Sequence, residues 1–179
     1  MADDNNMDIQ NTCKIISLLL DYPDQTLKDN LGNIILHIKE DKELSEEDRM
    51  QFNSFMDYAE GFASLLDWQE SYVGLFDTST KTNLYLFDYV YGSSKDRGQA
   101  MVDLKEMYMK SGMVPNENEL PDYLPQFLEF VSSLETEEAG KSLAEILPIL
   151  KQMVKRFERD SHPYLPLIKI LCNLSTQKQ

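Results

Sequence analysis

The chain has 179 residues and a mass of 20.7 kDa, which is the usual size of one domain. Its hydrophobic content of 42% and aromatic content of 10% are sufficient for a core and argue against disorder. Acidic residues outnumber basic residues by 31 to 17, and the net charge of −14 argues against a nucleic-acid partner, because phosphate binding requires a basic face.

Apolar runs and cysteine spacing favour a cytoplasmic protein. The longest apolar cluster, residues 15–20, is far shorter than a membrane span, and no basic stretch followed by an apolar run indicates a secretory signal. Cys13 and Cys172 lie at opposite ends of the chain, so we expect no disulfide framework and a reducing compartment. We also expect no stable membrane insertion.

Apolar residues recur at the helical period along most of the chain, and strand-like alternation is almost missing. The first apolar stripe consists of Ile9, Cys13, Ile16 and Leu20. The pattern predicts an all-α fold, namely a single globular bundle of about eight or nine helices. We expect one helical domain over residues 9–174, with flexible ends at residues 1–8 and 175–179.

Residues that are typical of helix starts and helix ends divide the chain into a series of expected helices. The expected helices begin at or close to Ile9, Thr26, Ser45, Phe62, Leu84, Ser93, Asp122, Thr136 and Ser161. The N-cap candidates, whose side chains can accept a hydrogen bond from the first turn, are Thr26, Ser45, Ser93 and Asp122. Gly92 and Gly112 are expected at helix ends, and Pro148 is expected to kink the long helix in which it lies.

Two points about the helix boundaries follow from the middle of the chain. Gly61 either bends one long helix or separates two adjoining helices, and both possibilities stay open. Residues 77–80 predict a break before the short helix over residues 84–91. The next helix is expected to bury an apolar face made of Ala100, Met101, Leu104, Met107 and Tyr108.

The negative charge is concentrated in the N-terminal third. Residues 1–60 hold 14 acidic and 5 basic side chains, whereas residues 121–179 hold 8 acidic and 7 basic side chains. This third is therefore a candidate surface for a cationic partner. A set of solvated outer helix faces accounts for the same composition, so both interpretations stay open.

No reactive constellation is visible in the sequence. A di-iron bundle requires a Glu-x-x-His pair on each of two helices, and neither His37 nor His162 has a Glu three residues before it. A nucleophile elbow and a phosphate-binding loop are also missing. We expect no catalytic, metal or cofactor site, and therefore a protein that is not an enzyme.

A polar break between two apolar helices, residues 84–101, is the candidate binding feature. Its functional interpretation is a corner that shapes a groove for a guest peptide, with Gly98 allowing another backbone to approach closely. The residues expected to line this groove or form its floor are Tyr72, Phe76, Tyr85, Asp88 and Tyr91. The alternative is a plain helix–loop–helix corner in which Asp96 and Arg97 pair locally and the aromatic residues belong to the core.

Four segments appear in the order that is typical of a known family. They are Ser17-Leu-Leu-Leu-Asp-Tyr-Pro-Asp24, Tyr72-Val-Gly-Leu-Phe-Asp77, Ser94-Lys-Asp-Arg-Gly-Gln-Ala-Met-Val-Asp-Leu104 and Glu119-Leu-Pro-Asp-Tyr-Leu-Pro125. With these segments the chain resembles the NarJ family, the assembly chaperones of respiratory nitrate reductase, from about residue 9 to about residue 172. The family pattern usually has histidines where this sequence has Tyr89, Tyr91 and Tyr123.

The resemblance implies a cytoplasmic chaperone that binds the apo form of the catalytic α subunit of nitrate reductase, partly through the N-terminal segment of that subunit. It implies that the chaperone enables insertion of the molybdenum cofactor before membrane docking, and that the cofactor belongs to the client. Cofactor-delivery proteins are further possible partners, and a monomer and a dimer both stay open.

The resemblance also implies that four further residues contact the client: Asp96, Arg97, Gly98 and Asp122. Alternatives for the function are a maturation chaperone for another molybdoenzyme of the sulfoxide or amine-oxide reductase type, a non-redox acidic helical adaptor, and a small helical enzyme or nucleotide-binding protein.

Overall fold

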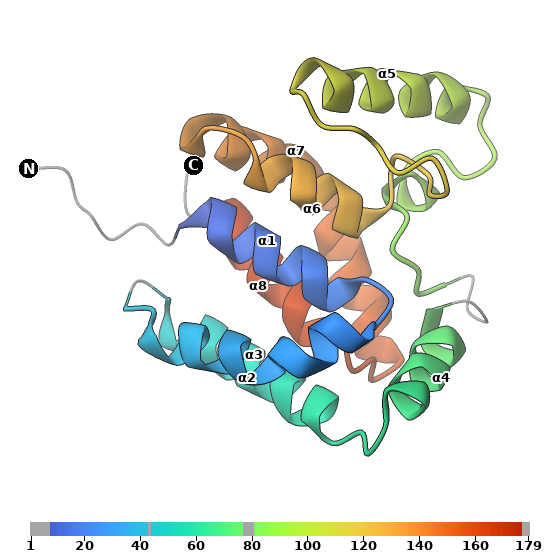
Figure 1. Ribbon diagram of the computed structural model, residues 1–179. Helices are drawn as coiled ribbons and strands as arrows, with labels where there is room; N and C mark the ends of the chain where they lie inside the picture. Colours follow the sequence, from blue (N-terminus) through green and yellow to red (C-terminus); the bar gives the residue numbers. More distant parts are fainter. Residues whose placement is uncertain (1–7, 43, 77–80, 177–179) are drawn as a thin grey trace, which may run out of the picture.

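The computed structural model describes residues 8–42, 44–76 and 81–176, so the expected flexible ends and the predicted break at residues 77–80 lie largely or wholly outside the described residues. The described residues form eight α-helices and one short 3-10 helix (Figure 1). Their bounds are α1 Ile9–Leu20, α2 Gln25–Glu40, α3 Glu46–Glu60, α4 Leu65–Phe76, η1 Leu86–Tyr89, α5 Asp96–Lys110, α6 Leu124–Ser132, α7 Thr136–Arg159 and α8 Leu165–Thr176. The all-α prediction is confirmed.

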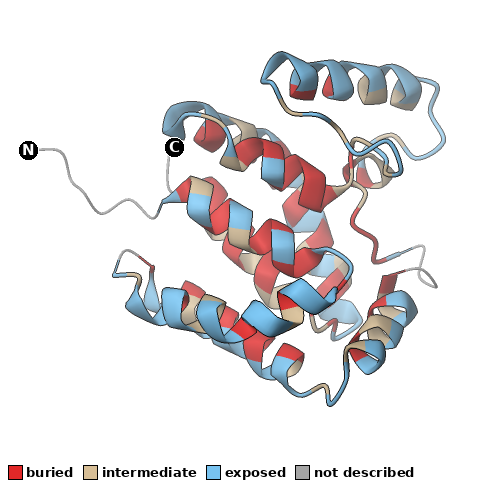
Figure 2. Cartoon of the chain, viewed as in Figure 1, coloured by how far each residue is buried: buried red, intermediate tan, exposed pale blue. Residues whose placement is uncertain are grey.

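The helix α1 lies at the centre of the bundle, where it packs against α6 and also contacts α7 and α8 (Figure 1). The C-terminal helices α7 and α8 pack against each other, α8 packs on α3, and α3 packs on α2. Figure 2 shows that the buried residues gather where these helices meet, whereas α5 stands apart and is mainly exposed. No helix in the described part of the chain is long and apolar enough to cross a membrane.

The first helix forms as the periodicity predicts. Asp8 caps it by accepting hydrogen bonds from the backbone N–H groups of Gln10 and Asn11, which have no partner inside the helix. The whole predicted stripe, Ile9, Cys13, Ile16 and Leu20, is buried. This helix therefore contributes one complete face to the core.

Three of the four predicted N-caps are wrong. The cap of α2 is Asp24 rather than Thr26, and its carboxylate accepts a hydrogen bond of 2.7 Å from the N–H of Leu27. The helix α5 begins after Lys95 rather than Ser93, and α6 begins after Tyr123 rather than Asp122. Ser45 is confirmed as the cap of α3, because its hydroxyl accepts a hydrogen bond from the N–H of Asp48.

Several helix ends are resolved by the structure. Gly61 is the C-cap residue of α3, so two helices form on either side of it rather than one bent helix. The helix expected over residues 84–91 is reduced to the single turn of η1. Gly92 and Gly112 both have positive φ angles, 53° and 84°, as expected of residues that end or redirect a helix.

The last two helices also differ in part from expectation. Pro148 lies inside α7, as predicted, and the kink expected there stays a prediction. The last helix starts at Leu165 rather than at Ser161. On α5 only Leu104 and Tyr108 of the predicted apolar face are buried. The Tyr108 hydroxyl donates a 2.6 Å hydrogen bond to the carbonyl of Pro121, which attaches this outlying helix to the loop before α6.

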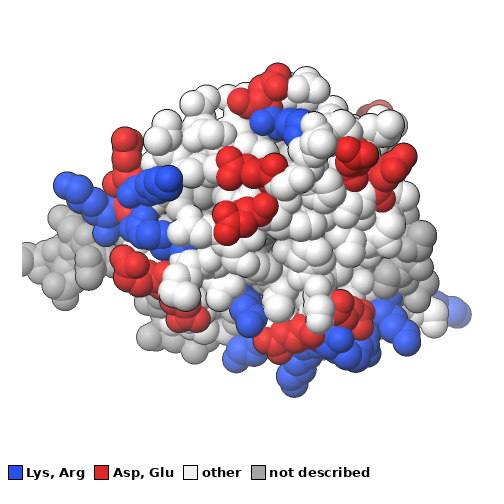
Figure 3. All heavy atoms as spheres, turned by 90° about the horizontal axis from the view of Figure 1, so that it is seen from below, with Lys and Arg blue, Asp and Glu red and all other residues white. Residues whose placement is uncertain are grey.

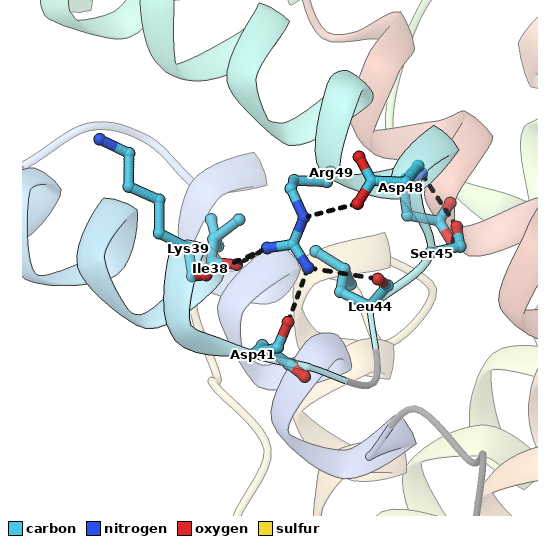
Figure 4. Close-up of polar contacts among 8 residues, drawn as sticks. Ile38, Lys39, Asp41, Leu44, Ser45, Asp48 and Arg49 are labelled. Atoms are coloured by element: carbon cyan, nitrogen blue, oxygen red, sulfur yellow. Dashed lines mark hydrogen bonds and ion pairs between the residues drawn. The ribbon is translucent and has the colours of Figure 1, made fainter.

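Arg49 fastens the end of α2 to the start of α3 (Figure 4). Its guanidinium donates to the carbonyls of Ile38, Lys39 and Asp41, which belong to the last turn of α2 and its C-cap, and to the carbonyl of Leu44 at 3.3 Å. The carbonyls of a last helical turn lack partners within the helix, so one side chain here supplies donors for several of them. The arrangement fixes the α2–α3 connection.

We expect Arg49→Ala to lower the free energy of unfolding by about 1–3 kcal/mol, because it leaves partly buried carbonyls without a donor. Urea denaturation followed by circular dichroism measures this loss. The matched control is Arg159→Ala, which removes an exposed arginine and should leave the urea midpoint unchanged. Equal midpoints for the two variants would contradict the capping role.

His162 lies in an aromatic part of the core. It is 4% exposed, its ring centroid is 4.3 Å from that of Phe157 and 4.8 Å from that of Phe76, and its Nδ1 accepts a hydrogen bond from the N–H of Tyr164. Burial lowers the pKa of His162 from its ordinary value of 6.5 to about 4, against the opposing effect of Asp160. His162 is therefore neutral in the folded protein at pH 7.

Because the pKa of His162 is lower in the folded state, its stabilising contribution is complete above pH 6.5 and is lost as the pH falls towards 4. We expect this loss to be on the order of 2–3 kcal/mol. The variant His162→Asn, whose amide oxygen can replace Nδ1 as acceptor, should lack this component of the pH dependence in urea unfolding at pH 7, 6 and 5. The exposed His37→Asn should keep it, and an identical pH slope in wild type and His162→Asn would refute the assignment.

Candidate functional site

Four segments far apart in the sequence meet around a cavity of about 190 Å³. They are the turn between α1 and α2, the face of α4, the segment before η1 and the loop before α6. The lining residues are Asp21, Tyr22, Tyr72, Phe76, Asn83, Leu84, Tyr85, Glu119 and Tyr123. Of the predicted site residues, the structure places Tyr72, Phe76 and Tyr85 in this cavity wall.

Hydroxyl groups hold the wall together. The Tyr72 hydroxyl donates to the carbonyl of Leu20 at 2.8 Å and lies 2.8 Å from the Tyr123 hydroxyl, which in turn lies 3.1 Å from Asp21 Oδ1. The Tyr85 hydroxyl donates to Glu119 at 2.8 Å. Three tyrosines of the wall, Tyr72, Tyr85 and Tyr123, thus have hydroxyl groups that are paired with one another, with a backbone carbonyl or with a carboxylate.

The carboxylates of Asp21 and Glu119 in the lining give the cavity a negative character. Desolvation raises the pKa of Asp21, hydrogen bonds from the Tyr22 N–H and the Tyr123 hydroxyl lower it in part, and the charges of Glu119 and Asp24 raise it further. Carboxylates that lie close to one another attract a cation that enters between them. The site therefore favours a guest that combines apolar and basic groups.

Asp122, Asp88 and Arg97 form a polar cluster beside the cavity. Asp122 is fully buried, and its Oδ2 accepts a 2.9 Å hydrogen bond from the N–H of Phe87. Arg97 forms an ion pair with Asp88 and also donates to the carbonyl of Gly92. Burial raises the pKa of Asp122, and the hydrogen bond from Phe87 and the charge of Arg97 oppose this rise.

Next to this cluster, two backbone hydrogen bonds pair residues 84–86 with residues 122–124 in antiparallel orientation. The N–H of Leu86 donates to the carbonyl of Asp122 at 2.9 Å, and the N–H of Leu124 donates to the carbonyl of Leu84 at 2.8 Å. Tyr85 and Tyr123 therefore face each other across an isolated bridge, with ring centroids 5.4 Å apart. The role predicted for Asp122 as a helix cap is replaced by this role as a tie between two loops.

The remaining predicted site residues do not line the cavity. Tyr91 packs its ring edge-on against Phe87, and Asp96 stands exposed in the first turn of α5. Around Gly98, no part of the described chain comes within 4 Å of the place where a Cβ would lie. The close backbone approach expected at Gly98 is therefore not made within this chain.

Sequence reasoning missed two further hollows that share Asp21 with the cavity. A groove of about 480 Å³ runs between α1 and α2, and a hollow of about 180 Å³ lies beside the loop before α6. The groove is lined by apolar residues that include Ile15, Leu18, Leu27 and Ile34. The sequence carried a signal for it, since Ile15 and Leu18 lie outside the core stripe of α1.

No reactive group stands out in these hollows. Burial raises the pKa of the Cys13 thiol to about 12 and that of the Cys172 thiol to about 11, so both are protonated at neutral pH. Within the ranges 8–42, 44–76 and 81–176, no three or more His, Cys, Asp or Glu side chains gather closely enough to hold a metal ion. The geometry is suited to binding.

The acidic side chains do not form one continuous patch on the face seen from below. Figure 3 shows the molecule from below, where the face is mainly uncharged and the acidic side chains are scattered singly or in small groups. Most basic side chains in this view lie towards the left and lower edges. On this face, negative charge is therefore offered by small groups of carboxylates rather than by one large acidic surface.

The fold matches that of a solved structure. A crystal structure of an Archaeoglobus fulgidus protein described as a redox enzyme maturation protein superposes with a TM-score of 0.64 at 23% sequence identity, over 92% of this chain and 91% of that chain. The described part of the chain thus has the same all-helical fold as that structure. More narrowly, the family model described as nitrate reductase delta subunit matches residues 41–169, and the chain belongs to this family.

Two relatives support the same assignment. The Escherichia coli K12 protein named nitrate reductase molybdenum cofactor assembly chaperone NarJ is 38% identical over 161 residues, which are 90% of this chain and 68% of that protein. A Bacillus subtilis strain 168 protein of the same NarJ designation is 32% identical over 169 residues, or 93% of this chain and 89% of that protein. The resemblance to the NarJ family is confirmed.

We expect Asp122→Ala to lower the free energy of unfolding by about 1–3 kcal/mol, because the Phe87 N–H loses its acceptor. Amide hydrogen exchange of Phe87 and Leu86 should become faster in the same variant. Asp122→Asn keeps an acceptor oxygen and should lose clearly less stability in urea denaturation. Equal losses in the two variants would show that the charge of Asp122, and not the hydrogen bond, stabilises the loop pairing.

Proposed function

We propose that this chain is a cytoplasmic assembly chaperone that binds the apo catalytic α subunit of respiratory nitrate reductase, including its N-terminal segment. The bound form of the client accepts the molybdenum cofactor before it docks at the membrane. The family membership and the chaperone names of the E. coli and B. subtilis relatives support this proposal. The cofactor belongs to the client, and cofactor-delivery proteins are proposed as transient further partners.

The observation that carries the proposal is the meeting of four distant segments around a tyrosine-lined cavity that has carboxylates in its wall. Such a surface offers apolar area, fixed hydrogen-bonding groups and negative charge, which together suit an unfolded basic segment. The candidate client contacts are Tyr72, Phe76, Tyr85, Asp88, Tyr91, Asp96, Arg97, Gly98 and Asp122. Those in the cavity wall would bind the segment, and those at the start of α5 would contact it from the side.

The test is complementation of a strain from which the gene has been deleted. We expect the deletion strain to contain the α subunit without molybdenum, and the wild-type gene to restore the metal, as measured by mass spectrometry of the purified subunit. We expect Arg97→Ala to restore at most a small fraction of the molybdenum content. The side chain is partly exposed, so loss of its ion pair with Asp88 should change thermal melting little.

Lys105→Ala is the matched control on the same helix, because it removes another exposed cation of α5, and it should restore molybdenum fully. A normal molybdenum content in the deletion strain would refute the proposed function. If Arg97→Ala unfolds the chain, Arg97 has a structural role and is removed from the set of client contacts.

A further inference from the structure

The buried carboxylate of Asp122 has one oxygen that no hydrogen bond uses. Asp122 is fully buried, and its Oδ2 accepts a 2.9 Å hydrogen bond from the N–H of Phe87. Its Oδ1 has no hydrogen-bond donor in the described part of the chain. A buried polar atom without a partner lowers stability, so its presence needs a physical explanation. One explanation is a donor that reaches this oxygen in a second arrangement of the neighbouring groups.

Arg97 is a charged donor close to this oxygen. Burial is the main cause that raises the pKa of Asp122, and the charge of Arg97 lowers this pKa whereas the charge of Asp88 raises it. Both charged groups therefore act on the buried carboxylate. In the structure the Arg97 guanidinium forms its ion pair with Asp88. Two carboxylates thus compete for one guanidinium.

The present contacts of Arg97 are weak enough to be exchanged. The side chains of Arg97 and Asp88 are 28% and 30% exposed, so water screens their ion pair. The hydrogen bond from Arg97 to the carbonyl of Gly92 is long, at 3.4 Å. Asp88 also accepts a 2.9 Å hydrogen bond from Asn83 Nδ2, which stays in place when Arg97 leaves.

The helix that carries Arg97 is attached to the core through its second half. Of α5, only Leu104 and Tyr108 are buried. Gly92 before the helix and Gly112 after it have positive φ angles, and no described atom beyond their chain neighbours lies within 4 Å of the place where a Cβ of either would be. Glycines of this kind are suitable hinges, because they accept large changes of φ and ψ. The first turn of α5 can therefore shift relative to the bundle.

We propose that Arg97 switches between two carboxylate partners and so holds α5 in two positions. In the first position the guanidinium pairs with Asp88, and α5 stands apart from the bundle, as Figure 1 shows. In the second position the guanidinium donates to Oδ1 of Asp122, which brings the first turn of α5 onto the pairing between residues 84–86 and residues 122–124. The switch consists of contacts within the chain and does not depend on the proposed function.

The second position also stabilises the wall of the tyrosine-lined cavity. A hydrogen bond between two charged groups is stronger than one between neutral groups, so the guanidinium fixes the carboxylate that also binds the Phe87 N–H. Asp122 belongs to the pairing that sets Tyr85 opposite Tyr123. The position of α5 is therefore coupled to the stability of this wall.

The test is hydrogen exchange of the arginine side chains, measured by NMR on the full chain labelled with nitrogen-15 arginine. We expect Asp88→Asn to move the Arg97 guanidinium onto Asp122. Its N–H groups should then exchange at least about fivefold more slowly than in the wild type, because they enter a buried contact. The signal of Arg97 is assigned by its loss in Arg97→Lys, and the spectrum is simple because the sequence has four arginines, namely Arg49, Arg97, Arg156 and Arg159.

Two further measurements identify the new partner. The double variant Asp88→Asn, Asp122→Asn lacks both carboxylates, so the Arg97 side chain should exchange faster in it than in the wild type. In Asp88→Asn alone, the backbone amides of Leu86 and Leu124 should exchange more slowly, because both donate hydrogen bonds within the pairing that the second position stabilises.

The matched control is Asp103→Asn, which removes another exposed carboxylate of α5, one that accepts a hydrogen bond from Gln99. It should change the exchange of Arg97 by less than about twofold. Unchanged or faster exchange of Arg97 in Asp88→Asn would overturn the inference, and so would slow exchange that persists in the double variant. Asp88→Ser removes the same charge and gives a second variant for the comparison if Asp88→Asn does not fold.

Discussion

The short pairing between residues 84–87 and residues 122–124 is the constraint on which the tyrosine-lined cavity depends. Two backbone hydrogen bonds and the buried carboxylate of Asp122 join loops that are more than thirty residues apart. The pairing sets Tyr85 opposite Tyr123, and Tyr123 reaches Tyr72 and Asp21. Without it, nothing in the local sequence would bring these hydroxyl groups into one wall.

The same pairing explains why α5 can stand apart from the bundle. The segment from η1 through α5 to residue 121 begins and ends at the paired loops, so backbone hydrogen bonds close its base. The helix α5 itself contacts the core through few residues, and the ring of Tyr108 lies 5.0 Å from that of Phe130. Only Leu104 and Tyr108 of α5 are buried, and Tyr108 is tied to Pro121. A helix held mainly at its base keeps most of its surface available for contact with another protein.

The sequence correctly predicted features that depend on local periodicity. It failed for features that depend on contacts between residues far apart in the chain. The stripe of α1 and the cap at Ser45 follow from residues within a few positions of one another, and both are confirmed. Asp122 has the side chain and the position of a helix cap, yet its carboxylate accepts a hydrogen bond from Phe87, thirty-five residues away. Local helix propensity does not take such a distant hydrogen-bond partner into account. The sequence therefore predicts the wrong N-cap residue for α6.

The grooves were missed for a related reason, which concerns α1. Residues 15–20 form the longest apolar cluster of the chain, and only Ile16 and Leu20 of this cluster belong to the predicted stripe of the first helix. Ile16, Leu19 and Leu20 are buried in the core, whereas Leu18 remains exposed in the groove and Ile15 is half-buried beside it. When a helix has more apolar residues than one core-facing stripe can hold, the additional residues form a second apolar face. The core of the protein does not bury this second face. Since a contiguous exposed apolar surface is disfavoured in water, this excess on α1 makes the groove a candidate interaction surface.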